Sequence, residues 1–255
     1  MARTIKLTIA YDGTAYAGWQ WQPEVPTIQG ALEEAIHKIT GERLRVIASG
    51  RTDAGVHALG QVVSFTTDSS LAAAVLGRAL NAELPRDIAV LSAEKVAERF
   101  HATRDAVRKR YRYVLHDGRQ PDVFRRRYAW HLWERLDEAA MHAAAQSWLG
   151  RHDFAAFESA GSQRITTVRT VYDATVARSA SEMNPEPNVI TFEIEADGFL
   201  YNMVRTMVGT LVEIGRGKRS VAWAAEVLSS RDRRLAGMKA PPEGLFLVRV
   251  DYDNI

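Results

Sequence analysis

The stretch Ser49-Gly50-Arg51-Thr52-Asp53-Ala54-Gly55-Val56-His57 lies between two short strand-like runs, residues 44–48 and 61–67. Two of its glycines enclose polar residues, and glycine is used where the backbone turns tightly or where another molecule approaches closely. Asp53 stands at the centre, two residues after Arg51 and four before His57. A loop held between two strands can fix one carboxylate accurately enough for catalysis. The alternative from spacing alone is an aspartate that caps its own turn.

The first half of the chain alternates between strand and helix patterns around this loop. Strands are predicted over 3–12, 44–48, 61–67 and 88–96, and helices over 27–41 and 71–82. The first helix has Thr27 as a suitable N-cap and Gly41 as a suitable end. The resulting order is β-α-β-β-α-β, which is the ferredoxin-like pattern.

The second half repeats this order with one extra helix. Strands are predicted over 109–116, 168–177, 189–196 and 245–252, and helices over 136–149, over 200–215 and from Ser220 onward. The pattern predicts an α+β fold in which two ferredoxin-like halves join in one mostly antiparallel sheet, with helices on one side and with the other face or the central seam left for a ligand. We place the division between an N-terminal subdomain, 1–104, and a C-terminal subdomain, 105–255.

Composition limits the classes of function. The 255 residues are 46% hydrophobic and 25% charged, which is typical of an ordinary globular protein, and no apolar run approaches the length of a membrane span. The N-terminus enters strand-like alternation directly, so we expect no signal peptide and a cytoplasmic location. The absence of cysteine excludes disulfides and thiolate chemistry, and the seven histidines are too scattered to favour a metal site.

Basic residues are unevenly distributed. Residues 105–127 contain eight basic and three acidic residues, whereas residues 1–104 contain eleven of each. Because this surplus falls near the junction of the two halves, the segment is well placed to bind a polyanion. Arginine, which accounts for 27 of the 33 basic residues, suits phosphate contact and base stacking.

Standard nucleotide and hydrolase motifs are absent. The run Gly215-Arg216-Gly217-Lys218-Arg219-Ser220 has a weak likeness to a phosphate loop, but Val212 stands where the first glycine belongs and Arg219 replaces the Ser/Thr. No GxGxxG, GxSxG or HExxH pattern occurs. Nucleotide hydrolysis, dinucleotide binding and serine or zinc hydrolysis therefore lose support.

Aromatic and arginine residues offer two further candidates, each with a structural alternative. Tyr111 lies in a strand among four basic residues, a combination that stacks an unpaired base while phosphates are held alongside; a core tyrosine is the alternative. Arg205 lies beside the apolar stripe of the 200–215 helix, from which it could pair with Asp53 and keep that carboxylate ionised. Otherwise it is a surface arginine of an amphipathic helix.

The loop between the first strand and the first helix is unusually rich in aromatic residues. Tyr16, Trp19 and Trp21 fall in this Gly/Gln-rich segment. Packing beneath the loop is the first interpretation, and contact with a stacked or flipped base is the second.

A series of motifs resembles the tRNA pseudouridine synthase A (TruA) family, in the same order and over nearly the whole chain. The most specific is Gly50-Arg51-Thr52-Asp53-Ala54-Gly55-Val56-His57-Ala58. The others are Ala10-Tyr11-Asp12-Gly13-Thr14, Gly18-Trp19-Gln20, Gly60-Gln61-Val62, Leu80-Asn81, Leu84-Pro85, Phe100-His101-Ala102, Arg110-Tyr111-Arg112-Tyr113, Gly150-Arg151-His152-Asp153-Phe154, Phe199-Leu200, Met203-Val204-Arg205 and Pro242-Glu243-Gly244-Leu245.

The resemblance implies an isomerase that converts uridine to pseudouridine at positions 38, 39 and 40 of the tRNA anticodon stem-loop, with no cofactor, since the reaction changes neither composition nor redox state. Asp53 matches the essential aspartate, which attacks the sugar C1′ or the uracil C6 or abstracts the C2′ proton. Tyr111 matches a tyrosine that stacks on the flipped uracil and assists removal of the C5 proton. Arg205 matches the arginine paired with the aspartate, and Leu245 an apolar residue of the pocket.

Further contacts and the assembly follow from the same resemblance. His57, within the most specific motif, is a candidate substrate contact. The candidates for gripping phosphates are Arg51, Arg108, Lys109, Arg110 and Arg126. The family is homodimeric, with tRNA lying across both subunits.

Two rival functions make different predictions. A non-catalytic tRNA-binding or RNA-folding protein would keep its cellular function after Asp53→Asn. A carboxylate enzyme acting on free nucleosides would normally need a second carboxylate near Asp53 and has no use for the arginine cluster. RNA binding should weaken steeply as salt rises, whereas nucleoside binding should not.

Overall fold

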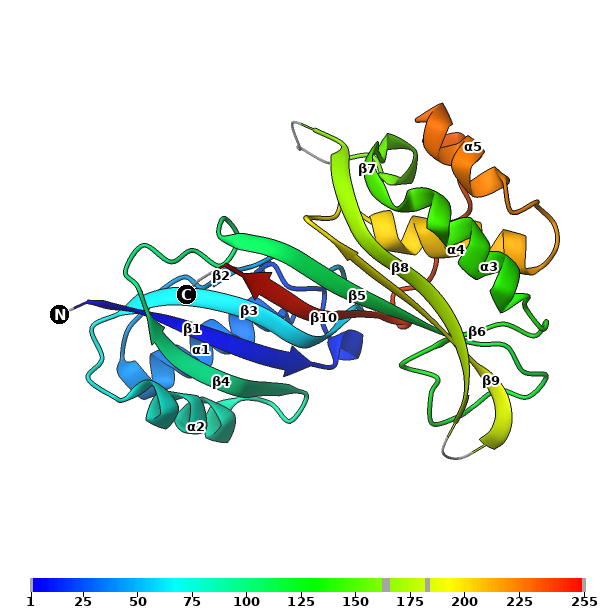
Figure 1. Ribbon diagram of the computed structural model, residues 1–255. Coiled ribbons are helices and arrows are strands. Elements are labelled where there is room, and N and C mark those ends of the chain that lie inside the picture. The colour runs from blue at the N-terminus through cyan, green and yellow to red at the C-terminus, as the bar shows by residue number, and fades with distance from the viewer. Residues whose placement is uncertain (1, 162–165, 182–183, 254–255) are drawn as a thin grey trace. The chain divides into compact units, whose positions relative to one another are not determined.

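A computed structural model describes residues 2–161, 166–181 and 184–253 (Figure 1). Two compact units are present, Met1–Lys109 together with Phe246–Ile255, and Arg110–Leu245. The chain passes from one unit to the other within two strands, β5 (Ala106–His116) and β10 (Leu245–Tyr252). The C-terminal strand thus belongs mainly with the first unit.

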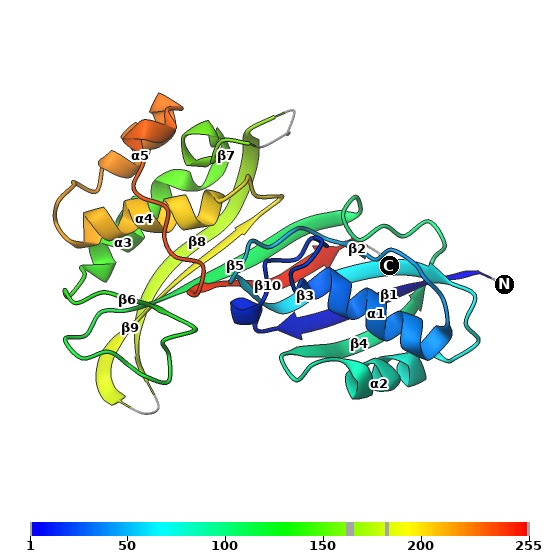
Figure 2. The same cartoon turned by 180° about the vertical axis from the view of Figure 1, so that it is seen from behind.

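The first unit is a sheet with two helices. Its elements are β1 (Arg3–Tyr11), α1 (Ile28–Thr40), β2 (Ile47–Ala48), β3 (His57–Thr67), α2 (Ala73–Glu83), β4 (Ile88–Val96) and the main part of β10. The strand order is β4-β1-β3-β10, with β2 beside β3. β1 runs antiparallel to β3 and β4, whereas β10 runs parallel to β3 and pairs Phe246 with His57. Figure 2 shows α1 crossing in front of the sheet, with α2 beside β4.

Local sequence explains these elements well. Alternation in β1 buries Ile5, Leu7 and Ile9 completely. Helix α1 begins where the Thr27 hydroxyl accepts a hydrogen bond from the Gly30 N–H, and it ends at Gly41 in the left-handed conformation. Both caps and the strand were predicted and are confirmed.

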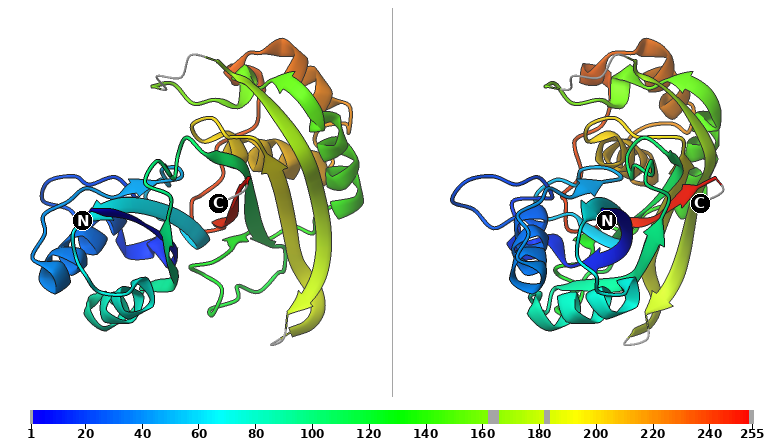
Figure 3. Two further views of the ribbon diagram at one scale, coloured as in Figure 1. Left: turned by 60° about the vertical axis from the view of Figure 1, so that its left-hand side comes forward. Right: turned by 90° about the vertical axis from the view of Figure 1, so that its left-hand side faces the viewer.

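The second unit contains β5, β6 (Trp130–His131), α3 (Glu138–Ala145), β7 (Gly150–Asp153), β8 (Val168–Ser181), β9 (Asn184–Ala196), α4 (Met203–Gly215) and α5 (Trp223–Ser230). The strand order is β5-β9-β8-β7, and β6 runs parallel beside β5. β8 is antiparallel to both of its neighbours, and Figure 3 shows the curvature of the β8–β9 pair. α3 packs along β8 and against α4, and the three helices lie together beside β7 and β8 (Figure 1).

The predicted α+β class with mostly antiparallel pairing is confirmed, but several boundaries differ. The predicted turn at 184–187 is instead the start of β9, and residues 182–183, between β8 and β9 in the sequence, lie outside the described residues. Prolines 185 and 187 are two apart, so the N–H groups they lack fall on one edge of the strand and pairing survives on the other. The predicted strand 44–48 shrinks to two residues, and β6 and β7 are too short for their periodicity to predict them.

Among the described residues, no helix is both long and apolar enough to cross a membrane.

Candidate functional site

The segment that carries Asp53 is held by backbone hydrogen bonds from another loop of the first unit. The Trp19 N–H donates to the Thr52 carbonyl at 3.0 Å, and the Val56 N–H donates to the Asp53 carbonyl at 3.1 Å. The Thr52 hydroxyl lies 2.8 Å from that of Tyr11, whose pKa burial raises to about 12, so the phenol stays neutral. The half-buried Asp53 therefore projects from a fixed backbone.

Glycine is required where these two loops meet. Gly18 has a φ of +100°, and a Cβ built on it would lie 2.8 Å from the Thr52 carbonyl oxygen and 3.0 Å from the Ala54 nitrogen. Gly55, directly after the Asp53–Ala54 pair, has a φ of +76°. Any side chain at Gly18 would push against the backbone that positions Asp53.

A second set of polar contacts holds the start of the Asp53 loop. The Lys109 ammonium donates to the Ser49 carbonyl at 2.7 Å, and the Ser49 hydroxyl donates to the Gln61 side chain at 2.6 Å. The Gln61 amide in turn donates to the Gly50 carbonyl at 2.8 Å. Gln61 was quoted from the sequence only within the Gly60-Gln61-Val62 motif, and its role here was not predicted, because a glutamine in a strand gives no signal of its partners. Lys109, predicted as a phosphate contact, has this additional role within the first unit.

His57 is buried, with only 1% of its surface exposed. Its Nδ1 accepts from the Gly13 N–H at 3.1 Å and lies 3.1 Å from an Asp12 carboxylate oxygen, and its ring stacks on Phe246 at 4.7 Å. These contacts join the turn that follows β1 to β3 and β10, so His57 has a structural role in the first unit. Direct contact with substrate stays a prediction.

The aromatic residues near Gly18 divide between the two interpretations. Tyr16 and Trp19 are buried, which supports packing beneath the loop. Trp21 is exposed, and the Arg45 guanidinium lies 5.3 Å from its ring centroid. Arg51 and Arg108, predicted as phosphate contacts, are both exposed residues of the first unit.

In the second unit, Tyr111 lies on β5 with 9% of its surface exposed. Its ring meets that of Phe199 edge-on, with 4.9 Å between centroids and 80° between planes. Phe199 therefore fixes the orientation of the tyrosine ring. Leu245, the first residue of β10, is buried, and its N–H donates to the Pro242 carbonyl at 2.9 Å.

Arg205 is an almost buried arginine in the first turn of α4. Its exposed fraction is 8%, its Nε donates to the Ala240 carbonyl at 2.8 Å, and one Nη donates to the Asn202 side chain at 3.1 Å. The Ala240 N–H returns a bond to the Arg205 carbonyl at 3.0 Å. The position was expected on the border of the apolar stripe; the structure buries it and fixes its guanidinium through two neutral acceptors.

Arg110 and Arg112 of β5 face carboxylates of the neighbouring strands. Arg110 bonds Asp173 at 2.9 Å and both Glu193 and Glu195 at 3.1 Å, and Arg112 bonds Glu193 at 2.7 Å. Partial burial alone would raise the pKa of Glu193, but hydrogen bonds from Arg112 and Arg110 outweigh it and hold that pKa below its usual value. Arg110, predicted to grip phosphate, is thus engaged by three carboxylates of its own unit.

Arg126 is exposed and lines a cavity of about 220 Å³ in the second unit. Arg125, His116 and His131 also line it, and the two histidine rings lie 5.1 Å apart. Burial, followed by the neighbouring His131, lowers the pKa of His116. Asp122, which lies 3.4 Å from Arg125, and Glu243 also line the cavity, so its two arginines are matched by two carboxylates, and contact of Arg126 with phosphate stays a prediction.

Within the described residues, no group of three or more His, Cys, Asp or Glu side chains is arranged to hold a metal ion.

A sequence model of a family described as tRNA pseudouridine synthase matches residues 7–104 and 144–253. Asp53, Arg205 and Leu245 fall inside the matched residues, whereas Tyr111 and Arg126 fall in the segment between them.

Curated relatives cover the chain almost completely. Proteins named tRNA pseudouridine synthase A are 49% identical in Moorella thermoacetica, over 97% of this chain and 99% of that protein, and 44% identical in Thermoanaerobacter sp. strain X514, over 98% and 100%. A protein of the same name in Geobacillus kaustophilus is 46% identical over 100% of this chain and 96% of its own length.

Proposed function

The chain belongs to the tRNA pseudouridine synthase family and is an isomerase that converts uridine in tRNA to pseudouridine, and we propose that it acts at positions 38, 39 and 40 of the anticodon stem-loop through Asp53. Membership of an enzyme family decides against the non-catalytic RNA-binding protein considered from the sequence. The observation that best supports Asp53 is the way in which the Gly18 loop, Tyr11 and Val56 hold its backbone.

The reaction breaks the bond from uracil N1 to the ribose C1′ and forms a bond from C5 to the same carbon. The C5 proton is lost and N1 gains one, so atoms and charge balance without an added reactant. Asp53 takes part as a nucleophile at C1′ or C6, or as the base that removes the C2′ proton. All three roles need an ionised carboxylate in a fixed position, because the attacking oxygen or base must be within bonding reach of one atom.

The other candidates have complementary roles. Arg205 pairs with the Asp53 carboxylate and keeps it ionised, and its bonds to Ala240 and Asn202 hold the guanidinium in position. Tyr111, oriented by Phe199, stacks on the flipped uracil and assists removal of the C5 proton. Leu245 contributes an apolar surface to the uracil pocket.

Flipping a base out of the anticodon stem costs a few kcal/mol of stacking, which phosphate contacts must offset. We assign those contacts to Arg51, Arg108, Lys109, Arg110 and Arg126. Exposure supports Arg51, Arg108 and Arg126. Lys109 and Arg110 already have internal partners, so a phosphate would have to share or displace them. The proposal also includes a homodimer that acts in the cytoplasm.

The test is to incubate the protein with a tRNA transcript and to map pseudouridine along it. Wild type should modify uridines at 38, 39 and 40 and nowhere else. Asp53→Ala should bind the transcript with wild-type affinity and form no pseudouridine. Modification outside the anticodon arm would disprove the proposed positions, and residual activity of Asp53→Ala would disprove the proposed role of the carboxylate.

A further inference from the structure

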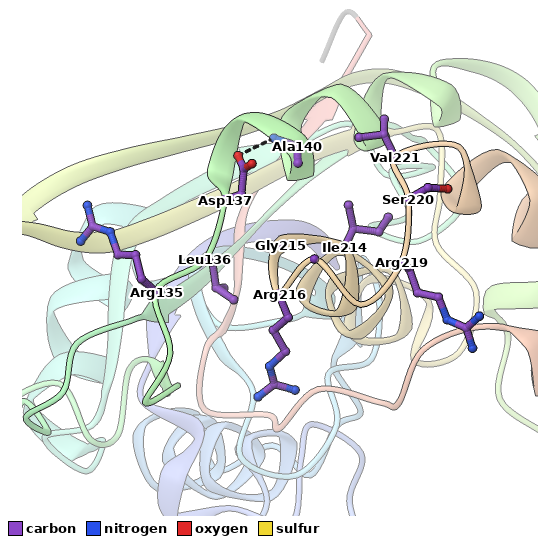
Figure 4. A pocket seen from close by; sticks show the side chains of 11 residues that line it. Arg135, Leu136, Asp137, Ala140, Ile214, Gly215, Arg216, Arg219, Ser220 and Val221 are labelled. Carbon is purple, nitrogen blue, oxygen red and sulfur yellow. Dashed lines mark hydrogen bonds between the residues drawn. The ribbon is translucent and has the colours of Figure 1, made fainter.

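A cavity of the second unit lies at the C-terminal end of α4 and has a volume of about 540 Å³ (Figure 4). We call it the α4-end cavity. Its lining residues are Arg135, Leu136, Asp137, Ala140, Ile214, Gly215, Arg216, Gly217, Arg219, Ser220 and Val221. The set includes nearly all of the run 215–220, whose weak likeness to a phosphate loop the enzymatic function leaves unexplained.

Three arginines and one aspartate carry the charge of this lining. Figure 4 shows the side chains of Arg135, Arg216 and Arg219 spread around the rim, with Leu136 and Ile214 between them. Asp137 is occupied as the N-cap of α3, where it accepts from the Ala140 N–H at 2.9 Å. The cavity therefore has an excess of positive charge.

Arg216 is explained by the protein itself. Its guanidinium lies 3.0 Å from carboxylates of Glu134 and Glu213, and it caps the negative end of the α4 dipole. An anion bound here would compete with two glutamates, so we leave Arg216 out of the proposed site.

Arg135 and Arg219 are not accounted for in this way. The Arg135 side chain is 56% exposed, and one of its Nη atoms lies 3.9 Å from a carboxylate oxygen of Asp117. Asp117 is already bound by both Nη atoms of Arg178, at 2.7 and 2.8 Å. Arg219 stacks on the ring of Trp223, 4.9 Å from its centroid, which fixes the guanidinium plane and leaves its N–H edges for an acceptor.

The serine of the cavity adds one more donor. Ser220 lies two residues before Ala222, the N-cap of α5, and its hydroxyl can donate to an anion. The N–H groups of Trp223, Ala225 and Glu226 already donate to the carbonyls of Ser220 and Ala222, so they are not part of the proposed site. Arginine and serine hydroxyls are donors that bind phosphate in nucleic-acid complexes.

We propose that the α4-end cavity binds the tRNA backbone through Arg135 and Arg219, each of which contacts one phosphate, away from the reacting uridine. The inference rests on tRNA being the substrate. Arg205, assigned to the reacting site, lies ten residues before Gly215 on α4, a separation of about 15 Å along the helix axis. The bound phosphates are therefore several nucleotides from the flipped base or on another part of the folded tRNA, and the contacts add affinity without taking part in the chemistry.

The test compares wild type with the double variant Arg135→Ala/Arg219→Ala, using a tRNA transcript and a salt titration of Kd. Each lost phosphate contact should make the slope of log K against log salt shallower by about 0.7 to 0.9. The double variant should therefore bind less tightly at low salt, with a slope reduced by about 1.5, and approach wild type as salt rises. At saturating tRNA its rate of pseudouridine formation should equal that of wild type.

Two further variants separate charge from folding. Arg135→Lys/Arg219→Lys should recover most of the slope, because lysine also binds phosphate as a point charge. Arg78→Ala, at an exposed position of α2 in the first unit, should leave the slope unchanged. If the double alanine variant has a lowered melting temperature, the single variant Arg135→Gln replaces it. That variant should make the slope of log K against log salt shallower by about 0.7.

The outcomes distinguish this inference from the proposed function. A wild-type salt slope in the double variant, while wild type modifies the tRNA normally, would overturn the cavity as a phosphate site and leave the enzyme assignment intact. A lower rate at saturating tRNA would place Arg135 or Arg219 in the reacting site and would also overturn it. If wild type forms no pseudouridine at the three anticodon positions, the proposed function fails whatever the slope.

Discussion

The Asp53 loop of the first unit and the arginine-rich strand β5 of the second unit use polar side chains in opposite ways. Around Asp53, polar groups of Tyr11, Gln61 and Lys109 bond to neighbouring loop groups, mainly backbone carbonyls, and so position a carboxylate. On β5, the charges of Arg110 and Arg112 are taken up by carboxylates of β8 and β9. In the sequence, the loop and the basic strand both look like functional sites. In the structure, the arginines of the basic strand also form ion pairs with carboxylates of the protein itself.

Substitution of Asp53 should have the largest effect on activity. Asp53→Asn keeps the shape of the side chain but removes the ionised oxygen, so we expect pseudouridine formation to fall by about 10⁴-fold, the order seen when one member of a catalytic group is removed. Single-turnover assays with tRNA would measure the loss. Binding and the melting temperature should stay near wild type, and a loss of folding would mean that Asp53 acts by capping its turn.

Substitution of Arg110 should have the largest effect on stability. Arg110→Ala would leave Asp173, Glu193 and the nearly buried Glu195 without their shared cation, which we expect to cost about 3–5 kcal/mol of unfolding free energy. Urea denaturation measures this loss. Arg108→Ala, at an exposed position of the same strand, is the control and should change stability by less than about 0.5 kcal/mol.

The same pair of variants separates structural from RNA-binding arginines. Arg108→Ala should make the salt slope of tRNA binding shallower by about 0.7. If Arg110→Ala does this too and melts like wild type, the carboxylate cluster is not its main role, and the contrast with the Asp53 loop disappears. Adding Glu195→Gln to Arg110→Ala should recover part of the lost stability, because it removes the charge of the most buried of the three carboxylates.

The elements with strong local signals were predictable. β4 and β10 occur at the predicted limits, and α1 has the predicted caps, because alternation and capping residues act within a few positions. The place of a strand within the sheet was not predictable in this way. Residues 246–255 cluster with the first unit through parallel pairing to β3, a contact between strands almost 190 residues apart that leaves no pattern in either.

The candidate site shows the same limit. Asp53 could be selected from its glycine-flanked loop, but the part that Gln61 and Lys109 play in holding that loop could not be predicted, because their partners are backbone carbonyls 11 and 60 residues away. The excess of basic residues in segment 105–127 was visible in the composition. The partners of Arg110 were not, because they depend on the register between β5 and β9. Pairing register is set by the whole sheet and is invisible in a single strand.

Substitution at Gly18 tests whether the rigidity of the Asp53 loop matters. Gly18→Ala places a methyl group 2.8 Å from the Thr52 carbonyl oxygen, so the backbone that carries Asp53 must shift. We expect activity to fall by about 10²-fold, the order of loss that a misplaced reacting group causes.

The matched control is Gly41→Ala, which has a similar positive φ of +76° but nothing within 4 Å of the added methyl. It should cost about 1 kcal/mol of stability and no activity; equal losses of activity in both variants would mean that strain alone is responsible.

The smallest expected effect concerns the pKa of His116 at the end of β5. Burial disfavours the charged imidazolium of His116, whereas carboxylates stabilise the charged guanidinium of Arg110 on the same strand. Burial, His131 and Arg125 lower the pKa of His116, and the opposing attraction of Asp122 and Asp117 does not restore it.

As the pH falls, the imidazole of the unfolded chain binds its proton near pH 6.5, before that of the folded protein does. Lowering the pH through that value therefore favours the unfolded state. Wild type should therefore lose stability between about pH 7 and 5, and His116→Gln should lose less of it. The glutamates with lowered pKa, Glu193 and Glu138, destabilise only as the pH falls below their unfolded value near 4.5, and the aspartates with lowered pKa, Asp105 and Asp232, only below theirs near 3.8, so both pairs act outside this window. Urea midpoints at pH 7.5 and 5.5 for the two proteins measure the difference, and parallel shifts would show that another group is responsible.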